Sequence, residues 1–257
     1  MTQAERREYL IRALLAERGL RQTDVLQRGE QQQKAQLRAL FNLRAPKPAS
    51  AEFLAVQDAY LQEALREKGL TDADALTPVR DRICLWQGDI TTLRCDAIVN
   101  AANERMLGCF CPNHGCIDNA IHTFAGVQLR CFCADMMEKQ GHEEVTGGAK
   151  ITPAFNLPCR YILHTVGPVV SGEVTATDRT LLASCYESCL TLAERHGVET
   201  LAFCCISTGE FCFPPQEAAT TALETVSRYL ARNTSLKKVI FNVFKNSDAD
   251  IYRRLLG

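Results

Sequence analysis

The sequence lacks a net charge, a long apolar run and an export signal. Its 29 basic and 30 acidic residues leave a formal charge of −1, so no basic excess marks a dedicated nucleic-acid binder. No segment approaches the ~20 apolar residues that a membrane span requires. The charged start, Met1–Glu8, has no apolar core of a signal peptide. These absences exclude membrane-spanning, secreted and disordered classes. They predict a globular cytoplasmic protein that binds neither nucleic acid nor membranes.

Two common nucleotide-binding motifs are also absent, the Walker A loop and the G-x-G-x-x-G turn. Cysteine, in contrast, is abundant. All 13 cysteines lie between Cys84 and Cys212, together with all 5 histidines, and the first 80 residues contain neither. Because the count is odd and no export signal is present, a disulfide framework is not expected. The cysteines are interpreted as buried apolar residues, metal ligands or reactive thiols.

Residues 1–78 are predicted to form a helical extension. Thr2 and Glu5 fit a capping box, in which each side chain bonds the backbone N–H of the other residue. Apolar residues then recur at helical spacing. Three helices are expected, from Thr2 to about Gly19, over Gln31–Phe41, and from Ser50 to about Gly69. This segment has no cluster of reactive side chains, so we expect it to pack on a second domain over residues 79–257.

After residue 80, short β-rich segments alternate with helical ones. The expected strands are Ile83–Gln87, Ala97–Asn100, Tyr161–Val166, Leu201–Ile206 and Lys238–Phe244. The expected helices are Ile117–Glu138, Thr177–His196 and Pro215–Ala231. This alternation predicts an α/β fold whose mostly parallel or mixed sheet is covered on both faces. Ligands of such sheets bind beyond the carboxyl ends of the strands.

Two asparagines close an expected buried strand in the segment Asp96–Asn103, which follows the motif Gly88–Thr91. Asn100 and Asn103 flank two alanines. A side-chain amide just past a buried strand needs a partner, because an unpaired buried amide is destabilising. The alternative is a turn in which an asparagine bonds its own backbone.

A cysteine-rich loop, Gly108–Cys116, contains three cysteines and one histidine. Thiolate and imidazole are ligands that zinc prefers. Cys109, His114 and Cys116 supply three ligands, which leaves a fourth position open to water or substrate. Cys111 as a fourth ligand would close the site. The remaining alternative is a loop whose cysteines are incidental.

A third segment, Ile206–Pro214, leaves an expected strand and enters a helix. Its small residues allow backbone amides to approach a phosphate, and the N-terminus of the following helix favours an anion. An ordinary strand–helix loop is the alternative.

Together these segments resemble the macrodomain family, whose members bind ADP-ribose. The matching segments follow one another through most of residues 83–257: Gly88–Thr91, Asp96–Asn103, Cys116–His122, Gly148–Thr152, Leu157–Pro158, Tyr161–Pro168 and Ser207–Pro214. The sequence is most similar to MacroD-type ADP-ribosyl hydrolases, but its cysteine-rich loop replaces their glycine run. In this it resembles the zinc-dependent macrodomains of bacteria and fungi, which also have a helical N-terminal extension. The resemblance implies a three-layer α/β/α macrodomain with a central mixed sheet.

The resemblance also assigns roles to individual side chains. For the adenine of ADP-ribose, Asp89 and the Ile90 backbone match the residues at the amino group, and Phe244 matches a residue that stacks on the base. Asn103 matches the residue at the distal ribose. The diphosphate would be bound by Ser207, Thr208, Gly209, Glu210 and Phe211, and Phe211 would also lie near the distal ribose. For zinc, they are Cys109, His114 and Cys116, with Cys111 as a neighbour. For catalysis, they are Asn103 and Asp118, and Asp118 orients the attacking water or accepts its proton near the scissile bond.

The implied function is zinc-dependent removal of mono-ADP-ribose from acidic side chains of a target protein. Zinc would hold either a distal-ribose hydroxyl or the attacking water. The resemblance further implies a setting beside a sirtuin-type ADP-ribosyltransferase and a lipoylated carrier like the glycine cleavage H protein. Two alternatives remain open: an ADP-ribose reader that does not hydrolyse and has a structural zinc, and a deacetylase of O-acetyl-ADP-ribose.

Overall fold

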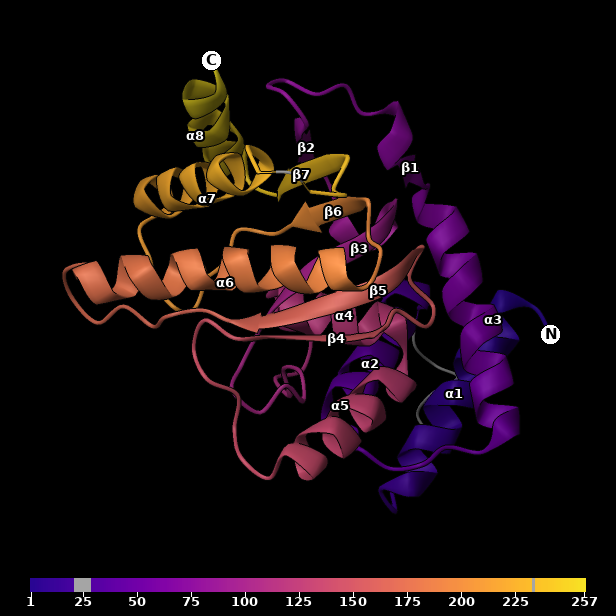
Figure 1. Cartoon of the computed structure of the whole chain (residues 1–257). Helices are drawn as coiled ribbons and strands as arrows, with labels where there is room; N and C mark the ends of the chain where they lie inside the picture. The colour runs from indigo at the N-terminus through magenta and orange to yellow at the C-terminus, as the bar shows by residue number, and fades with distance from the viewer. Residues whose placement is uncertain (21–28, 233) are drawn as a thin grey trace.

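A seven-stranded mixed sheet forms the centre of the computed structural model, which describes residues 1–20, 29–232 and 234–257 (Figure 1). The strands are β1 (Thr71–Asp72), β2 (Ile83–Gln87), β3 (Leu93–Ala102), β4 (Ala149–Pro153), β5 (Cys159–Val166), β6 (Thr200–Phe203) and β7 (Lys238–Val243). Their order is β2-β7-β6-β3-β5-β4, and β1 pairs with β3 outside this path. These pairings are parallel except that of β4 with β5, which confirms the predicted mixed sheet.

Helices cover both faces of the sheet, as the sequence predicts (Figure 1). The helices α6 (Ala176–Arg195), α7 (Pro215–Leu230) and α8 (Asn246–Leu256) pack in sequence on one face. The helices α4 (Ile117–Ala125) and α5 (Val127–Gln140) lie on the other face, where α4 contacts β3 and α5 contacts β4. Among the described residues, no helix is both long and apolar enough for a transmembrane span.

One expected helix, Ile117–Glu138, is two helices in the structure. The break is at Gly126, where φ is +98°. A Cβ at this position would lie 2.7 Å from Nε2 of Gln57 in the N-terminal extension. Gly126 therefore provides both the left-handed backbone and the space that the extension needs.

Some strands, and the helix α8, differ from the sequence-based prediction. The expected strand Leu201–Ile206 ends at Phe203, because the chain leaves the sheet there to form the loop before α7. The strands β1 and β4 were not expected, and neither was α8. Of these, β4 lies at the sheet edge and β1 has only two residues, so neither has the long apolar pattern of a central strand.

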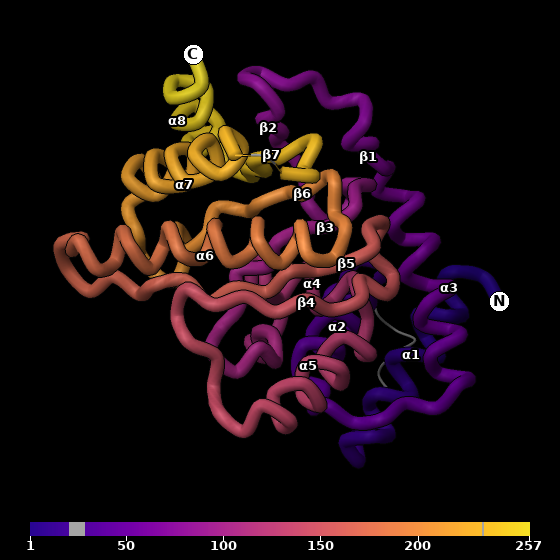
Figure 2. Tube along the Cα trace, in the orientation of Figure 1, coloured from indigo at the N-terminus to yellow at the C-terminus, as the bar shows by residue number. Residues whose placement is uncertain are grey.

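The predicted helical extension consists of α1 (Gln3–Glu17), α2 (Glu30–Leu43) and α3 (Ala51–Lys68). The capping box of Thr2 and Glu5 is present. The three helices share a second apolar core, to which α5 contributes Val127 and against which Phe124 of α4 packs. Figure 2 shows α2 beside α4, which it contacts. The domain boundary at residue 78 stays a prediction.

Candidate active site

The loops that follow four parallel strands lie at one edge of the sheet. The strands β2, β7, β6 and β3 are neighbours and run in the same direction, so their carboxyl ends meet. The segments that leave them are residues 88–92, 103–116, 204–214 and 244–245. This edge is where ligands of open α/β sheets bind. It contains every predicted site residue except Asp118, which lies on α4.

Asp89 caps a short 3₁₀ helix, η2 (Ile90–Thr92), directly after β2. Its Oδ1 accepts hydrogen bonds from the backbone N of Thr91 at 3.0 Å and from the Thr91 hydroxyl at 2.6 Å. Its Oδ2 accepts one from Nζ of Lys68, at the end of α3, at 2.8 Å. Burial raises the pKa of Asp89, but the bonds from Lys68 and Thr91 outweigh this effect, and the pKa lies below its ordinary value. Asp89 is therefore an ionised acceptor.

The two apolar residues predicted to border adenine differ in exposure. Ile90 is buried within η2 and packs into the core, so only its backbone can face a ligand. Phe244 follows β7 and has 75% of its surface exposed. Its backbone carbonyl accepts a hydrogen bond from Gln87 at the end of β2, at 3.3 Å. The Phe244 ring is therefore available for stacking on a planar ligand.

Asp118 lies in the first turn of α4 and is buried. The two asparagines at the end of β3 hold its two oxygens. Nδ2 of Asn100 donates to Oδ1 at 2.8 Å, and Nδ2 of Asn103 donates to Oδ2 at 3.3 Å. The oxygen of Asn103 also accepts from the backbone N of Arg105 at 3.1 Å, so the alternative turn is present as well. Burial raises the pKa of Asp118 to about 6, against the lowering effect of Asn100, Arg130 and Asn103.

Two buried histidines lie close to Asp118 and Asn100. Nε2 of His122, one turn further along α4, is 3.6 Å from Oδ1 of Asp118. Neither ring nitrogen of His122 has a hydrogen-bond partner among the described residues, and burial lowers its pKa well below the ordinary value. His164 on β5 receives a hydrogen bond from Asn100 at Nδ1, at 3.1 Å. We therefore assign its proton to Nε2, which donates to Thr152 at 3.0 Å.

The three predicted zinc ligands come together in the loop between β3 and α4. The ligand atoms of Cys109, His114 and Cys116 lie within 4.8 Å of one another, and Sγ of Cys109 is 3.6 Å from Nδ1 of His114. Cys111 is exposed and lies outside this group. Cys116 also caps α4, because its sulfur accepts from the backbone N of Asn119 at 3.4 Å.

The chemistry of this donor set fits a zinc ion. Burial raises the pKa of Cys116 to about 12, and the neighbouring Cys109 adds to the effect. Two adjacent thiolates therefore need a cation between them, and two sulfurs with one imidazole nitrogen are typical zinc ligands. Three donors leave one coordination position for water or substrate.

Residues 108–116, which contain the three predicted ligands, are called the metal loop. His114 connects this loop to the loop after β6. Its Nε2 lies 3.4 Å from Oε1 of Glu210, while its Nδ1 faces Cys109. A metal-bound imidazole commonly donates its other N–H to a carboxylate, which fixes the orientation of the ring. Glu210, predicted as a diphosphate-loop residue, thus also contacts a predicted metal ligand.

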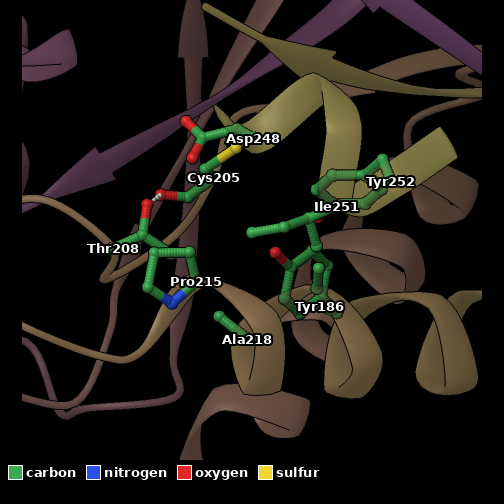
Figure 3. Close-up of a pocket in the computed structure, with 9 residues that line it drawn as sticks. Tyr186, Cys205, Thr208, Pro215, Ala218, Asp248, Ile251 and Tyr252 are labelled. Atoms are coloured by element: carbon green, nitrogen blue, oxygen red, sulfur yellow. Dashed lines mark hydrogen bonds between the residues drawn. The ribbon is translucent and has the colours of Figure 1, made fainter. Parts of the chain in front are cut away.

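The predicted diphosphate loop is tightly folded between β6 and α7. Ser207 has a φ of +63°, and its carbonyl accepts from the backbone N of Phe213 at 2.9 Å. The Ser207 hydroxyl is buried and has no hydrogen-bond partner in the described chain. Thr208 donates to the carbonyl of Cys205 at 3.1 Å and borders a small cavity together with Asp248 (Figure 3). The carbonyl of Phe211 accepts from Val170 at 2.9 Å.

Two basic residues of the helical extension that contact this region were not predicted, and neither was Arg130 of α5, whose charge acts on Asp118. Lys68 bonds Asp89, and Arg38 of α2 bonds the carbonyl of His114 at 3.0 Å. Both come from the extension, where they stand among many other charged helical residues. Only their tertiary position separates them from solvated surface residues.

Comparison with known proteins gives consistent results. A family model described as "Macro domain" matches residues 99–222. A "Protein-ADP-ribose hydrolase" of Treponema medium is 55% identical over 261 residues, which cover 100% of both chains. A Staphylococcus aureus protein with the same name is 49% identical, over 96% of this chain and 94% of its own. The solved structure of a Trypanosoma brucei macrodomain in complex with ADP-ribose has a TM-score of 0.67 and 32% identity, over 85% of this chain and 95% of its own.

Proposed function

The chain belongs to the macrodomain family, and from this premise we propose that it is a hydrolase that releases ADP-ribose from modified protein side chains. The names of the two relatives support the reaction class. The observation that carries the proposal is a buried carboxylate, Asp118, held by two amides and only two residues from Cys116 of the metal loop. A carboxylate beside the proposed metal ligands can orient a water or accept its proton, which is what hydrolysis requires.

The proposed ligand extends from Asp89 to Asp118. Asp89 accepts the adenine amino group beside the Ile90 backbone, and Phe244 stacks on the base. The loop of Ser207, Thr208, Gly209, Glu210 and Phe211 holds the diphosphate. The unpartnered hydroxyl of Ser207 supports this role, since a buried donor without a partner is costly until a ligand oxygen accepts from it. Asn103, which already donates to Asp118, also contacts the distal ribose.

The proposed reaction is hydrolysis of an ester between ADP-ribose and an aspartate or glutamate side chain. A zinc ion held by Cys109, His114 and Cys116 would supply Lewis acidity at its open position. Asp118, with a pKa of about 6, is mostly ionised at neutral pH and accepts a proton from the attacking water. Asn103 keeps the carboxylate directed toward the ribose. The water oxygen bonds to one of the two carbons of the ester linkage, and the C–O bond at that carbon breaks. The proton taken by Asp118 passes to the departing oxygen or to solvent, and the products are ADP-ribose and a free carboxylate.

We extend the proposal to the setting of the reaction. The resemblance to zinc-dependent macrodomains supports a cytoplasmic enzyme that reverses the modification made by a sirtuin-type ADP-ribosyltransferase. It also supports a lipoylated carrier protein like the glycine cleavage H protein as the substrate. A pull-down of such a carrier, modified and unmodified, tests this extension. Selective capture of the modified form by the Asp118→Ala variant is the expected result.

The experiment that tests the function measures ADP-ribose release from a protein modified on aspartate or glutamate. We expect release by the wild-type chain, loss of release with a strong chelator, and recovery with added zinc. Asp118→Ala is expected to abolish release and to retain ADP-ribose binding by calorimetry. Asp135→Ala, at an exposed position on α5, is the matched control.

Three other outcomes would change the assignment. Binding without release under every condition would leave the reader as the function. Release that is indifferent to chelation would remove zinc from the reaction. Hydrolysis of O-acetyl-ADP-ribose without any release from modified protein would favour the deacetylase.

A further inference from the structure

We propose that Arg38, on α2 of the N-terminal extension, is a positioning residue for the metal loop, so that the extension forms part of the metal site. The inference rests on the proposed function, because it takes Cys109, His114 and Cys116 as the metal ligands. It is independent of the reaction that the metal supports.

The Arg38 guanidinium reaches the loop through two acceptors. Its Nε and Nη2 donate to Oδ1 of Asn119 at 3.1 and 2.8 Å. Its Nη2 also donates to the carbonyl of His114 at 3.0 Å. The side chain therefore contacts the backbone of one metal ligand directly. The planar guanidinium places Nε and Nη2 together on Asn119 while Nη2 also bonds His114, and the single nitrogen of lysine cannot reproduce this paired contact.

Asn119 connects Arg38 to a second proposed ligand, Cys116, and to the loop backbone at Cys111. It is fully buried, and its backbone N donates to Sγ of Cys116 at 3.4 Å. Its Nδ2 donates to the carbonyl of Cys111 at 3.0 Å. Because Arg38 occupies the oxygen of this amide, the NH₂ group must face the loop. Arg38 thus determines which way the amide points.

A second residue of α2, Asn42, also holds the loop through a hydrogen bond. Oδ1 of Asn42 accepts from the backbone N of Asn113 at 2.9 Å, and Nδ2 donates to Thr123 of α4 at 3.0 Å. Asn113 has a φ of +55°, in the left-handed region that asparagine enters more readily than most residues, and this hydrogen bond helps to hold its backbone there. The helix therefore fixes two consecutive loop residues, Asn113 and His114.

A buried arginine of α5 ties α2 to the start of the loop. Nη1 of Arg130 donates to the carbonyls of Phe41 and Asn42 at 3.2 and 2.8 Å. Its Nε donates to the carbonyl of Leu107 at 2.7 Å, just before the loop begins. The end of α2 and the entry to the loop are thus held by one guanidinium. These hydrogen bonds hold the loop from α2 and α5, outside the loop itself, and we infer that they preorganise it for an ion.

Preorganisation raises metal affinity because less ordering remains to be done on binding. Hydrogen bonds that orient metal ligands typically change metal affinity by about 10-fold to 100-fold when they are removed. We expect a change of this size for Arg38→Gln, which is too short to reach both acceptors. We expect a similar loss for Arg38→Lys, which keeps the charge and loses the fork.

The test measures zinc affinity of the full chain by competition with a chromophoric chelator. The matched control is Lys34→Gln, because Lys34 lies one turn earlier on α2 and pairs with Glu30 at 2.8 Å, away from the loop. Two further readouts are the cobalt(II)–thiolate absorption band and hydrogen exchange of residues 109–116 in metal-free protein. The expected result is weaker zinc binding, a changed cobalt band and faster exchange in both Arg38 variants, with Lys34→Gln like wild type.

Zinc affinity and loop exchange equal to wild type in Arg38→Gln would overturn the proposal. If that variant unfolds, Arg38→Lys decides the question by the same readouts at a temperature where it is folded. Equal losses in Lys34→Gln would also overturn it, because the effect would then be general destabilisation of α2. If wild-type protein binds no zinc, the metal part of the proposed function fails. Loop exchange in the metal-free variants still decides whether Arg38 positions the loop.

Discussion

Replacing Asp89 with asparagine should reduce ADP-ribose affinity and alter base preference. A carboxylate has about four acceptor positions on its two oxygens. Thr91 uses two positions on Oδ1, and Lys68 uses one on Oδ2. One position on Oδ2 therefore remains for the adenine amino group. In Asp89→Asn, the oxygen stays with Thr91, and an NH₂ group faces both Lys68 and the amino group.

The magnitude follows from the lost charged acceptor. A hydrogen bond to a charged group contributes about 1.5–3 kcal/mol, which corresponds to a factor of about 10 to 150 in Kd. The effect on folding is smaller, about 1 kcal/mol or less, because both Lys68 and Asp89 are roughly one-third exposed. Affinity and stability should therefore separate clearly in this variant.

Calorimetry with two ligands provides the assay. The first is ADP-ribose, and the second is its hypoxanthine analogue, in which a ring carbonyl replaces the amino group. Wild type should prefer ADP-ribose, and Asp89→Asn should lose or reverse that preference, because its NH₂ can donate to the carbonyl. Asp72→Asn is a matched control, since Asp72 also caps a 3₁₀ helix and pairs with a basic residue, Arg94. Wild-type affinity and preference in Asp89→Asn would refute the placement of adenine.

Three further predictions concern other parts of the molecule. Elemental analysis should find one zinc per chain in Cys111→Ser and none in Cys109→Ser. Equal loss of zinc in both variants would make Cys111 a ligand. Phe244→Ala should weaken ADP-ribose binding by about 5-fold to 100-fold in calorimetry, as expected for loss of base stacking, with unchanged thermal stability because the ring is exposed. Burial lowers the pKa of His164 from 6.5 to about 3. Below pH 6.5 the unfolded chain therefore takes up a proton that the folded chain excludes, and the free energy of unfolding falls as the pH drops. This loss reaches about 2 kcal/mol near pH 5 and should be absent from the pH dependence of His164→Gln in denaturant titrations; identical pH slopes would contradict it.

The parts of the fold that the sequence predicted have a local signature. Ile83–Gln87 matches β2 at both ends because its apolar run is bounded by clear breaks. The break at Gly126 was not predicted, because part of the need for it comes from Gln57 and Asn156, which only the tertiary structure brings close to this position. The expected strand Leu201–Ile206 extends three residues beyond β6, because Cys204 and Ile206 are buried in the core without being in the sheet.

The candidate site also contains residues that a local sequence pattern reveals and residues whose contacts depend on tertiary packing. The three predicted metal ligands lie within eight residues of one another, so their spacing is visible in the sequence. The bond from Lys68 to Asp89 spans 21 residues, and that from Arg38 to Asn119 spans 81. Such pairs depend on how α2 and α3 pack, and no periodicity or motif encodes them. Helical propensity predicted the extension as an element but not its contacts with the loops.

The shared core of the extension has a consequence for the order of folding during synthesis. The helices α1 to α3 are complete once Lys68 has been made, but Val127 and Phe124, which pack into their core, are about 60 residues further along the chain. At about 5–20 residues per second, the ribosome needs roughly 3 to 12 seconds to supply them. During that interval only the part of the extension's core that Val127 and Phe124 later cover lacks its packing partners. The extension can therefore begin to pack its helices against one another early, but it completes its core only when α4 and α5 emerge.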